Sequence, residues 1–78
     1  MVLDGKTLLK IRKVYRLTME EVAYLLKVSV TFYRNVERGL KPLPDAKAQV
    51  LIDRLDLTES KLAEIVGIYE RFQIDVYQ

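Results

Sequence analysis

The sequence predicts an all-α protein of five helices that form a single domain over its 78 residues. Apolar residues recur at intervals of three and four in five separate segments, as on one face of a helix. A residue type that favours a helix start (Asp, Thr, Ser or Pro) precedes each segment. Both prolines fall within one short stretch, residues 39–44, which is therefore expected to be a loop. A chain of this length forms one small domain of modest stability.

A first helix is expected over residues 4–15, with Asp4 or Thr7 near its start. Its apolar face is predicted from the helical spacing of four residues: Leu8, Ile11, Val14 and Tyr15. Basic residues cover the remainder, and Lys10 is one of them. These lysines either contact nucleic-acid phosphate or form a solvated helix face.

Two short helices joined by a tight turn are expected over residues 18–39, which form the centre of the chain. Thr18 is predicted to cap the first of them, with Glu21 completing a capping box. Ser29 is a second capping residue only eleven positions later, so the connection has room only for a sharp turn. Gly39 is expected to end the second helix of the pair, since glycine readily adopts a left-handed backbone.

The second helix of this pair, predicted over residues 30–38, has two different faces. Phe32, Tyr33 and Val36 supply apolar contact, whereas the opposite face mixes methyl groups, a guanidinium and an amide (Val30, Thr31, Arg34 and Asn35). Packing is favoured for Phe32, with a thymine contact or a protein interface as alternatives. The Tyr33 ring is expected to enter the core with its hydroxyl group bonded to a partner.

This stretch and its surroundings resemble the helix-turn-helix of the phage-repressor family, also called the XRE or Cro-like family, over about residues 5–62. The resemblance rests on an ordered set of features: Leu8 and Ile11, Arg12, L-T-x-E-E-V-A at 17–23, V-S at 28–29, E-R-G at 37–39 and Pro42. Met19 departs from it, because the family usually has a phosphate-gripping glutamine there. Lys27 also departs, because the family's turn usually has a glycine with positive φ. The region of the fourth helix is one residue longer than the alignment expects.

The resemblance implies a lambda-repressor-like fold and sequence-specific binding of double-stranded DNA by a transcriptional regulator, a repressor of phage or mobile-element type. The third helix would lie in the major groove. Base contacts would come from Val30, Thr31, Arg34 and Asn35, and phosphate contacts from Lys10, Arg38 and Lys41. The resemblance also implies a structural ion pair between Arg12 and Glu37 that ties the first helix to the third.

A fourth helix is expected from Pro44 or Asp45 to Leu55, burying Ala48, Leu51, Ile52 and Leu55. Thr58 is predicted to cap a long apolar fifth helix that reaches about Phe72. The last part, F-Q-I-D-V-Y, alternates apolar and polar residues, so a short strand is an alternative there.

The segment 58–78 has more apolar residues than a small domain is expected to expose. We expect it to form a homodimer interface through Ile68, Tyr69, Phe72, Ile74 and Val76, which would make the DNA operator palindromic. The alternative is that the tail folds back and completes the core of the monomer.

Composition limits the other function classes. The chain has no cysteine and no histidine, so disulfides, thiolate chemistry and the usual zinc ligands are excluded. The adjacent Glu20 and Glu21 do not suggest a metal site, because neighbours on a helix point in different directions. No residue set resembles catalytic machinery, so we expect neither an enzyme nor a cofactor or small-molecule ligand.

Charge is uneven along the chain although the net charge is only +2. Residues 1–41 contain nine Lys/Arg against four Asp/Glu, and residues 42–78 contain four against seven. The basic half includes the predicted helix-turn-helix, which suits a nucleic-acid surface; an excess of +5 is also ordinary for a solvated surface. No segment has the apolar length of a membrane span and the N-terminal sequence does not resemble a signal peptide, so we expect a cytoplasmic protein.

A second hypothesis is a protein-interaction module of the same fold, which binds a repressor, a toxin or a polymerase without contacting DNA. It rests on Met19 at the phosphate-contact position and on the apolar Val30 and Phe32 of the third helix.

Overall fold

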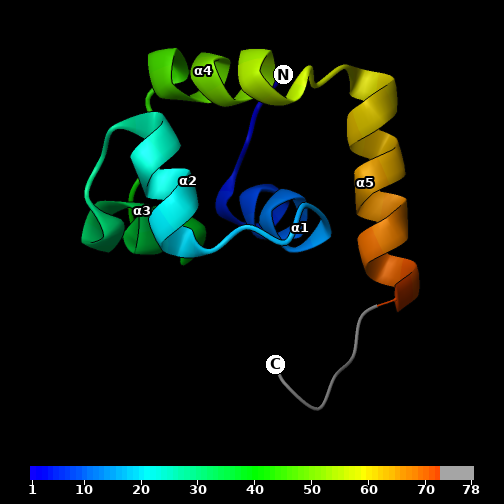
Figure 1. Ribbon diagram of the computed structural model, residues 1–78, viewed down its shortest axis with the longest axis horizontal. Helices are drawn as coiled ribbons and strands as arrows, with labels where there is room; N and C mark the ends of the chain where they lie inside the picture. The colour runs from blue at the N-terminus through cyan, green and yellow to red at the C-terminus, as the bar shows by residue number, and fades with distance from the viewer. Residues whose placement is uncertain (73–78) are drawn as a thin grey trace.

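The computed structural model describes residues 1–72, and this part of the chain folds as five helices without a strand (Figure 1). They are α1 (Gly5–Val14), α2 (Met19–Leu26), α3 (Val30–Glu37), α4 (Asp45–Leu55) and α5 (Glu59–Phe72). The prediction of five helices is confirmed. The strand alternative is not borne out at Phe72, which is helical. The remainder of that segment, with Ile74 and Val76, lies outside the described residues.

Side-chain oxygens begin four of these helices. Asp4 accepts a hydrogen bond from the amide of Thr7 at 2.9 Å, and Ser29 accepts one from Phe32 at 3.0 Å. At the start of α2 the predicted capping box is complete, with both reciprocal bonds formed. Thr58 accepts from the Lys61 amide at 3.0 Å. These bonds satisfy amides that have no partner within their own helix.

Three helices are followed by a residue other than glycine in the left-handed region. They are Arg16, Lys27 and Asp56, with φ of 58°, 57° and 53°. Such a backbone costs a non-glycine residue on the order of 1 kcal/mol. The positive φ expected at Lys27 is confirmed, and Gly39, with φ of 79°, ends α3 as predicted.

α1 lies between the α2–α3 pair and α5, while α4 runs across one end of the molecule and contacts α2 (Figure 1). The core contains side chains from all five helices and from two residues outside them, Leu3 and Leu57. These two residues were not predicted to be buried. Its most completely buried side chains come from α1 to α4: Leu8, Ile11, Val22, Leu26, Tyr33, Val36 and Leu51. α5 contributes only Ile65 to the buried set within the described residues.

The N-terminus of α1 approaches the C-terminus of α3 closely at Gly5. A Cβ atom at this position would lie 2.5 Å from the carbonyl oxygens of Val36 and Glu37. Only glycine fits against these backbone atoms without displacing them. This approach fixes the distance between α1 and the end of α3.

Candidate nucleic-acid interface

The outer face of α3 is the candidate reading surface. Thr31, Arg34 and Arg38 are exposed, and Asn35 between them is half-buried. Their spacing of three, four and seven positions places the four side chains on one stripe of the helix. The stripe combines a hydroxyl, an amide and two guanidinium groups, which are the donors and acceptors used in base and phosphate recognition.

Val30, the fifth predicted contact on α3, lies differently. It is half-buried and packs against the core, as does Phe32. The packing favoured for Phe32 is therefore confirmed. Only part of the Val30 side chain remains accessible, because position 30 lies at the edge of the stripe rather than on it.

The turn between α2 and α3 is held by short backbone bonds. The amide of Val28 donates to the Ala23 carbonyl at 3.0 Å, and that of Lys27 donates to Tyr24 at 3.2 Å. Val22, Ala23 and Leu26 of α2 are buried, as are Tyr33 and Val36 of α3. The two helices therefore share one core, and the opposite side of α3 is left to solvent.

The ion pair between Arg12 and Glu37 is present and links α1 to α3. Nε of Arg12 donates to Glu37 Oε2 at 2.6 Å, and its NH2 group donates to Oε1 at 3.1 Å. The two side chains are 10% and 5% exposed. Arg12 also donates to the carbonyl of Leu17 at 3.2 Å. The hydrogen bonds to Glu37 raise the pKa of Arg12 and so favour its charged form.

Tyr33 lies beside this pair with its ring fully buried, as expected. The prediction that its hydroxyl reaches a partner is wrong, because no group in residues 1–72 forms a hydrogen bond with it. Burial raises the pKa of Tyr33, and the nearby Glu37 carboxylate raises it further. A buried hydroxyl without a hydrogen bond is costly, so this position trades polar satisfaction for packing of the ring.

The three predicted phosphate contacts are not grouped together. Arg38 and Lys41 are exposed beside the end of α3. Lys10 instead pairs with Glu70 of α5 at 3.1 Å. α5 and α3 pack on different sides of α1 (Figure 1), so Lys10 is directed toward α5 rather than toward the α3 stripe.

The start of α2 is acidic and offers little to a phosphate. Glu20 and Glu21 are exposed there, and the side chain of Glu21 accepts from the Thr18 amide at 2.8 Å. The Thr18 hydroxyl in turn accepts from the Glu21 amide at 3.0 Å. The Met19 side chain packs against the core.

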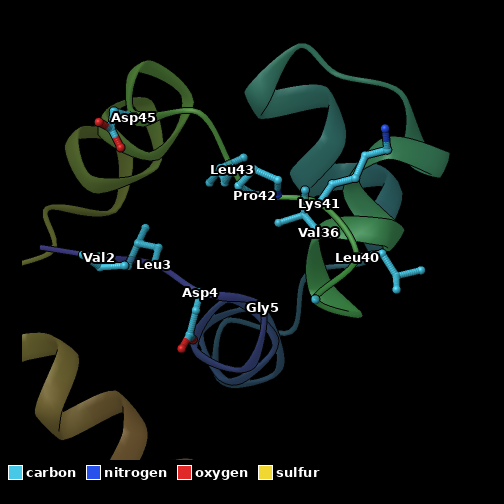
Figure 2. A pocket seen from close by; sticks show the side chains of 11 residues that line it. Val2, Leu3, Asp4, Gly5, Val36, Leu40, Lys41, Pro42, Leu43 and Asp45 are labelled. Carbon is cyan, nitrogen blue, oxygen red and sulfur yellow. The ribbon is translucent and has the colours of Figure 1, made fainter.

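A groove runs beside the end of α3, between the N-terminal segment and the loop before α4 (Figure 2). Leu3, Val36 and Leu43 contribute to its apolar lining. The Lys41 ammonium extends away from the groove, and the Asp4 carboxylate points to its outer side (Figure 2). Neither of these two charged groups is directed into the groove.

The predicted dimer surface is partly described. Ile68 and Phe72 on α5 are 38% and 69% exposed, and Tyr69 is half-buried. Ile74 and Val76 lie outside the described residues. An apolar strip on α5 is thus accessible up to the last described residue.

Within residues 1–72, no group of three acidic, cysteine or histidine side chains is arranged to hold a metal ion. In the same part of the chain, every helix is too short or too polar to cross a membrane. Comparisons of the chain with protein-family models, with curated proteins and with solved structures found no match.

Proposed function

We propose that the protein binds double-stranded DNA sequence-specifically through α3, as a lambda-repressor-like regulator of transcription. The observation that carries the proposal is the accessible stripe along α3, formed by Thr31, Arg34, Asn35 and Arg38. The opposite side of the same helix is packed in the core. A helix of this length fits the major groove, where its side chains meet base edges.

Each residue of the stripe has a specific role in this proposal. Arg34 donates two hydrogen bonds to guanine O6 and N7, and Asn35 bonds adenine N6 and N7. The methyl group of Thr31, with the accessible part of Val30, packs on thymine methyl groups. Each bidentate pair discriminates against the wrong base by roughly 1–3 kcal/mol.

Affinity without sequence preference comes from phosphate contacts, which release counterions and are therefore weakened by salt. Arg38 and Lys41 are the proposed phosphate ligands, since both are exposed beside the stripe. Lys10 is a weaker candidate than the sequence suggested, because it has Glu70 as a partner.

Dimerisation completes the proposal. A second copy docks on the apolar strip of α5 that includes Ile68 and Phe72, and Tyr69 supports it from the side. Two α3 helices then read the two halves of a palindromic operator. Occupation of a promoter in the cytoplasm by this dimer, on phage or mobile-element DNA, represses transcription.

Binding to a randomised duplex pool at two salt concentrations tests the proposal, with sequencing of the retained duplexes. We expect a short palindrome to be enriched, and binding to weaken at the higher salt. In Arg34→Ala, preference at one base pair of each half-site should be lost at a cost of roughly 1–3 kcal/mol.

Two further variants separate base reading from general loss of charge. Lys41→Ala should weaken all sequences alike and reduce the salt slope by about one unit. Lys61→Ala removes a cation of α5, which packs on the other side of α1 from α3, and should leave the preference unchanged. An intact preference in Arg34→Ala would rule out our assignment of the reading residues.

A second candidate is the protein-interaction module. The packed side chain of Met19 favours it, because methionine cannot make the phosphate contact that the family's glutamine makes there. Absence of both enrichment and salt-sensitive binding to duplex DNA would decide for this candidate.

A further inference from the structure

α2 carries an outer face that the proposed DNA contact does not use. Glu20, Tyr24 and Lys27 are all exposed and follow one another at four and three positions, so they share one side of the helix. Tyr24 is 83% exposed. No other large apolar or aromatic side chain in the five described helices is exposed to that degree.

Two shallow depressions lie on either side of Tyr24 and carry opposite charges. One is lined by Leu17 and Leu25 together with the carboxylates of Glu20 and Glu21. The other is lined by Ala23, Leu25 and Val28 together with the cations of Lys27 and Arg54. Tyr24 and Leu25 belong to both.

The charges on this face are available for intermolecular contacts. Within residues 1–72 the two ion pairs are Lys10 with Glu70 and Arg12 with Glu37, so none of the charged groups around Tyr24 is paired there. Lys27, which carries one of these exposed cations, has its backbone in the left-handed region, where a glycine would be unstrained.

This arrangement is unsuited to DNA, because carboxylates at one end repel phosphate. It suits a protein surface with the opposite order of charges. A copy of α2 in antiparallel orientation has that order, because Glu21 precedes Tyr24 by three positions and Lys27 follows it by three. A two-fold axis through Tyr24 therefore brings the acidic end of each copy onto the basic end of the other, as an isologous interface requires.

We propose that the outer face of α2 is a self-association surface, on which a second copy of this chain docks through an antiparallel α2 pair centred on Tyr24. The two Tyr24 rings meet at the axis. The carboxylates of Glu20 and Glu21 in each copy face the cations of Lys27 and Arg54 in the other. The edges of the two tyrosine rings pack on the apolar residues that line the depressions.

The contact goes beyond the proposed DNA binding and does not depend on it. It uses α2, whereas the proposed operator-binding dimer uses α5. If both contacts form, the α2 pair joins one DNA-binding dimer to the next. A surface built on one eight-residue helix is small, so association is weak and falls as salt screens its charges.

Charge reversal tests the proposal in the full-length chain without DNA, by sedimentation equilibrium over a wide concentration range. Glu20→Lys and Lys27→Glu each place like charges opposite one another in the pair, so each variant should self-associate about tenfold more weakly than the wild type. Glu20 is chosen over Glu21 because Glu21 also caps α2.

An equimolar mixture of Glu20→Lys and Lys27→Glu is the decisive sample. One variant then presents only cations at these two positions and the other only anions, so attraction is restored at both ends of the antiparallel pair. We expect the mixture to associate about tenfold more strongly than either variant alone. A mixture that behaves as the average of its components would overturn the proposal.

Two control variants complete the design. Glu59→Lys reverses a glutamate that is also exposed, in the first turn of α5, and should leave association unchanged. Phe72→Ala should weaken only the α5 contact, so the effect of mixing should persist in that background. Loss of the mixing effect in Phe72→Ala, or a wild type whose association matches that of Glu20→Lys, would also overturn the proposal. None of these outcomes bears on DNA binding, which is measured separately.

Discussion

α3 and α5 both pack on α1, but different interactions hold them. The α1–α3 contact contains the Arg12–Glu37 pair, whose side chains are 10% and 5% exposed, and the close backbone approach at Gly5. The α1–α5 contact contains the Lys10–Glu70 pair, whose side chains are 24% and 60% exposed. One helix is positioned by buried directional bonds, and the other by apolar contact with an exposed ion pair at its edge.

This difference matches the proposed roles of the two helices. A helix that reads base edges must present its side chains in a constant orientation, since recognition depends on hydrogen-bond geometry. α3 meets this requirement because a bidentate pair and a glycine contact restrict both its rotation and its distance from α1. α5 needs no such precision in the proposal, and it retains apolar surface at Ile68 and Phe72 for a partner.

The largest expected effect comes from breaking the α1–α3 ion pair. Glu37→Ala leaves the Arg12 guanidinium buried without its carboxylate, which should lower the free energy of unfolding by about 3–5 kcal/mol. Urea unfolding followed by circular dichroism measures this change. A loss below about 1 kcal/mol would place this pair with ordinary surface pairs and remove the contrast between α3 and α5.

Two glycine substitutions should act with opposite signs. In Gly5→Ala the new methyl group meets the carbonyl oxygens of Val36 and Glu37, so we expect a loss of about 1–3 kcal/mol. In Gly67→Ala, within α5, the methyl group meets nothing within 4 Å. The better helix propensity of alanine should then add about 0.5–1 kcal/mol. Thermal unfolding of both variants checks the signs, and a stabilising Gly5→Ala would contradict the close approach.

The cap of α1 lies at the same end as the Gly5 contact and should depend on pH. The hydrogen bond from the Thr7 amide lowers the pKa of Asp4 below its ordinary value of 3.8. The charged cap therefore stabilises the fold above that value, and its contribution is lost as pH falls through the lowered pKa. Asp4→Ala should cost about 1 kcal/mol at pH 7, and the difference from the wild type should shrink below pH 3.8. Urea titrations at several pH values measure this, and a constant difference would contradict the assignment.

The smallest effect is expected for the α1–α5 ion pair. Glu70→Ala should lower stability by only about 0.2–1 kcal/mol, because the pair is solvated and its attraction is screened. The difference from the wild type should shrink further in 1 M salt. A cost comparable with that of Glu37→Ala would show that exposure does not distinguish the two contacts on α1.

The local features of this molecule could be predicted from the sequence. The capping residues Thr18, Ser29 and Thr58 were correctly identified, because a cap bonds an amide only three positions away. The positive φ at Lys27 was predicted from the family pattern, and the helix end at Gly39 from the ability of glycine to adopt a left-handed backbone.

The features that the sequence did not reveal depend on residues distant in the chain. Lys10 was expected at phosphate, but its ion-pair partner Glu70 is sixty positions away. The unpaired hydroxyl of Tyr33 depends on which groups surround it in the core. The charges around Tyr24 were not recognised as one face, because Arg54 joins them only where α4 packs on α2.

By itself, the sequence determined which segments are helical, the capping residues that begin α2, α3 and α5, and which face of each helix is apolar. Helix formation depends on contacts over three or four positions, so these properties are local. Only the tertiary structure decided that α3 is held to α1 by buried directional bonds, that α5 keeps apolar surface exposed and that α2 carries opposite charges around Tyr24. These properties depend on how helices distant in sequence approach one another. Burial of the shared core determines that approach, and no local sequence pattern encodes it.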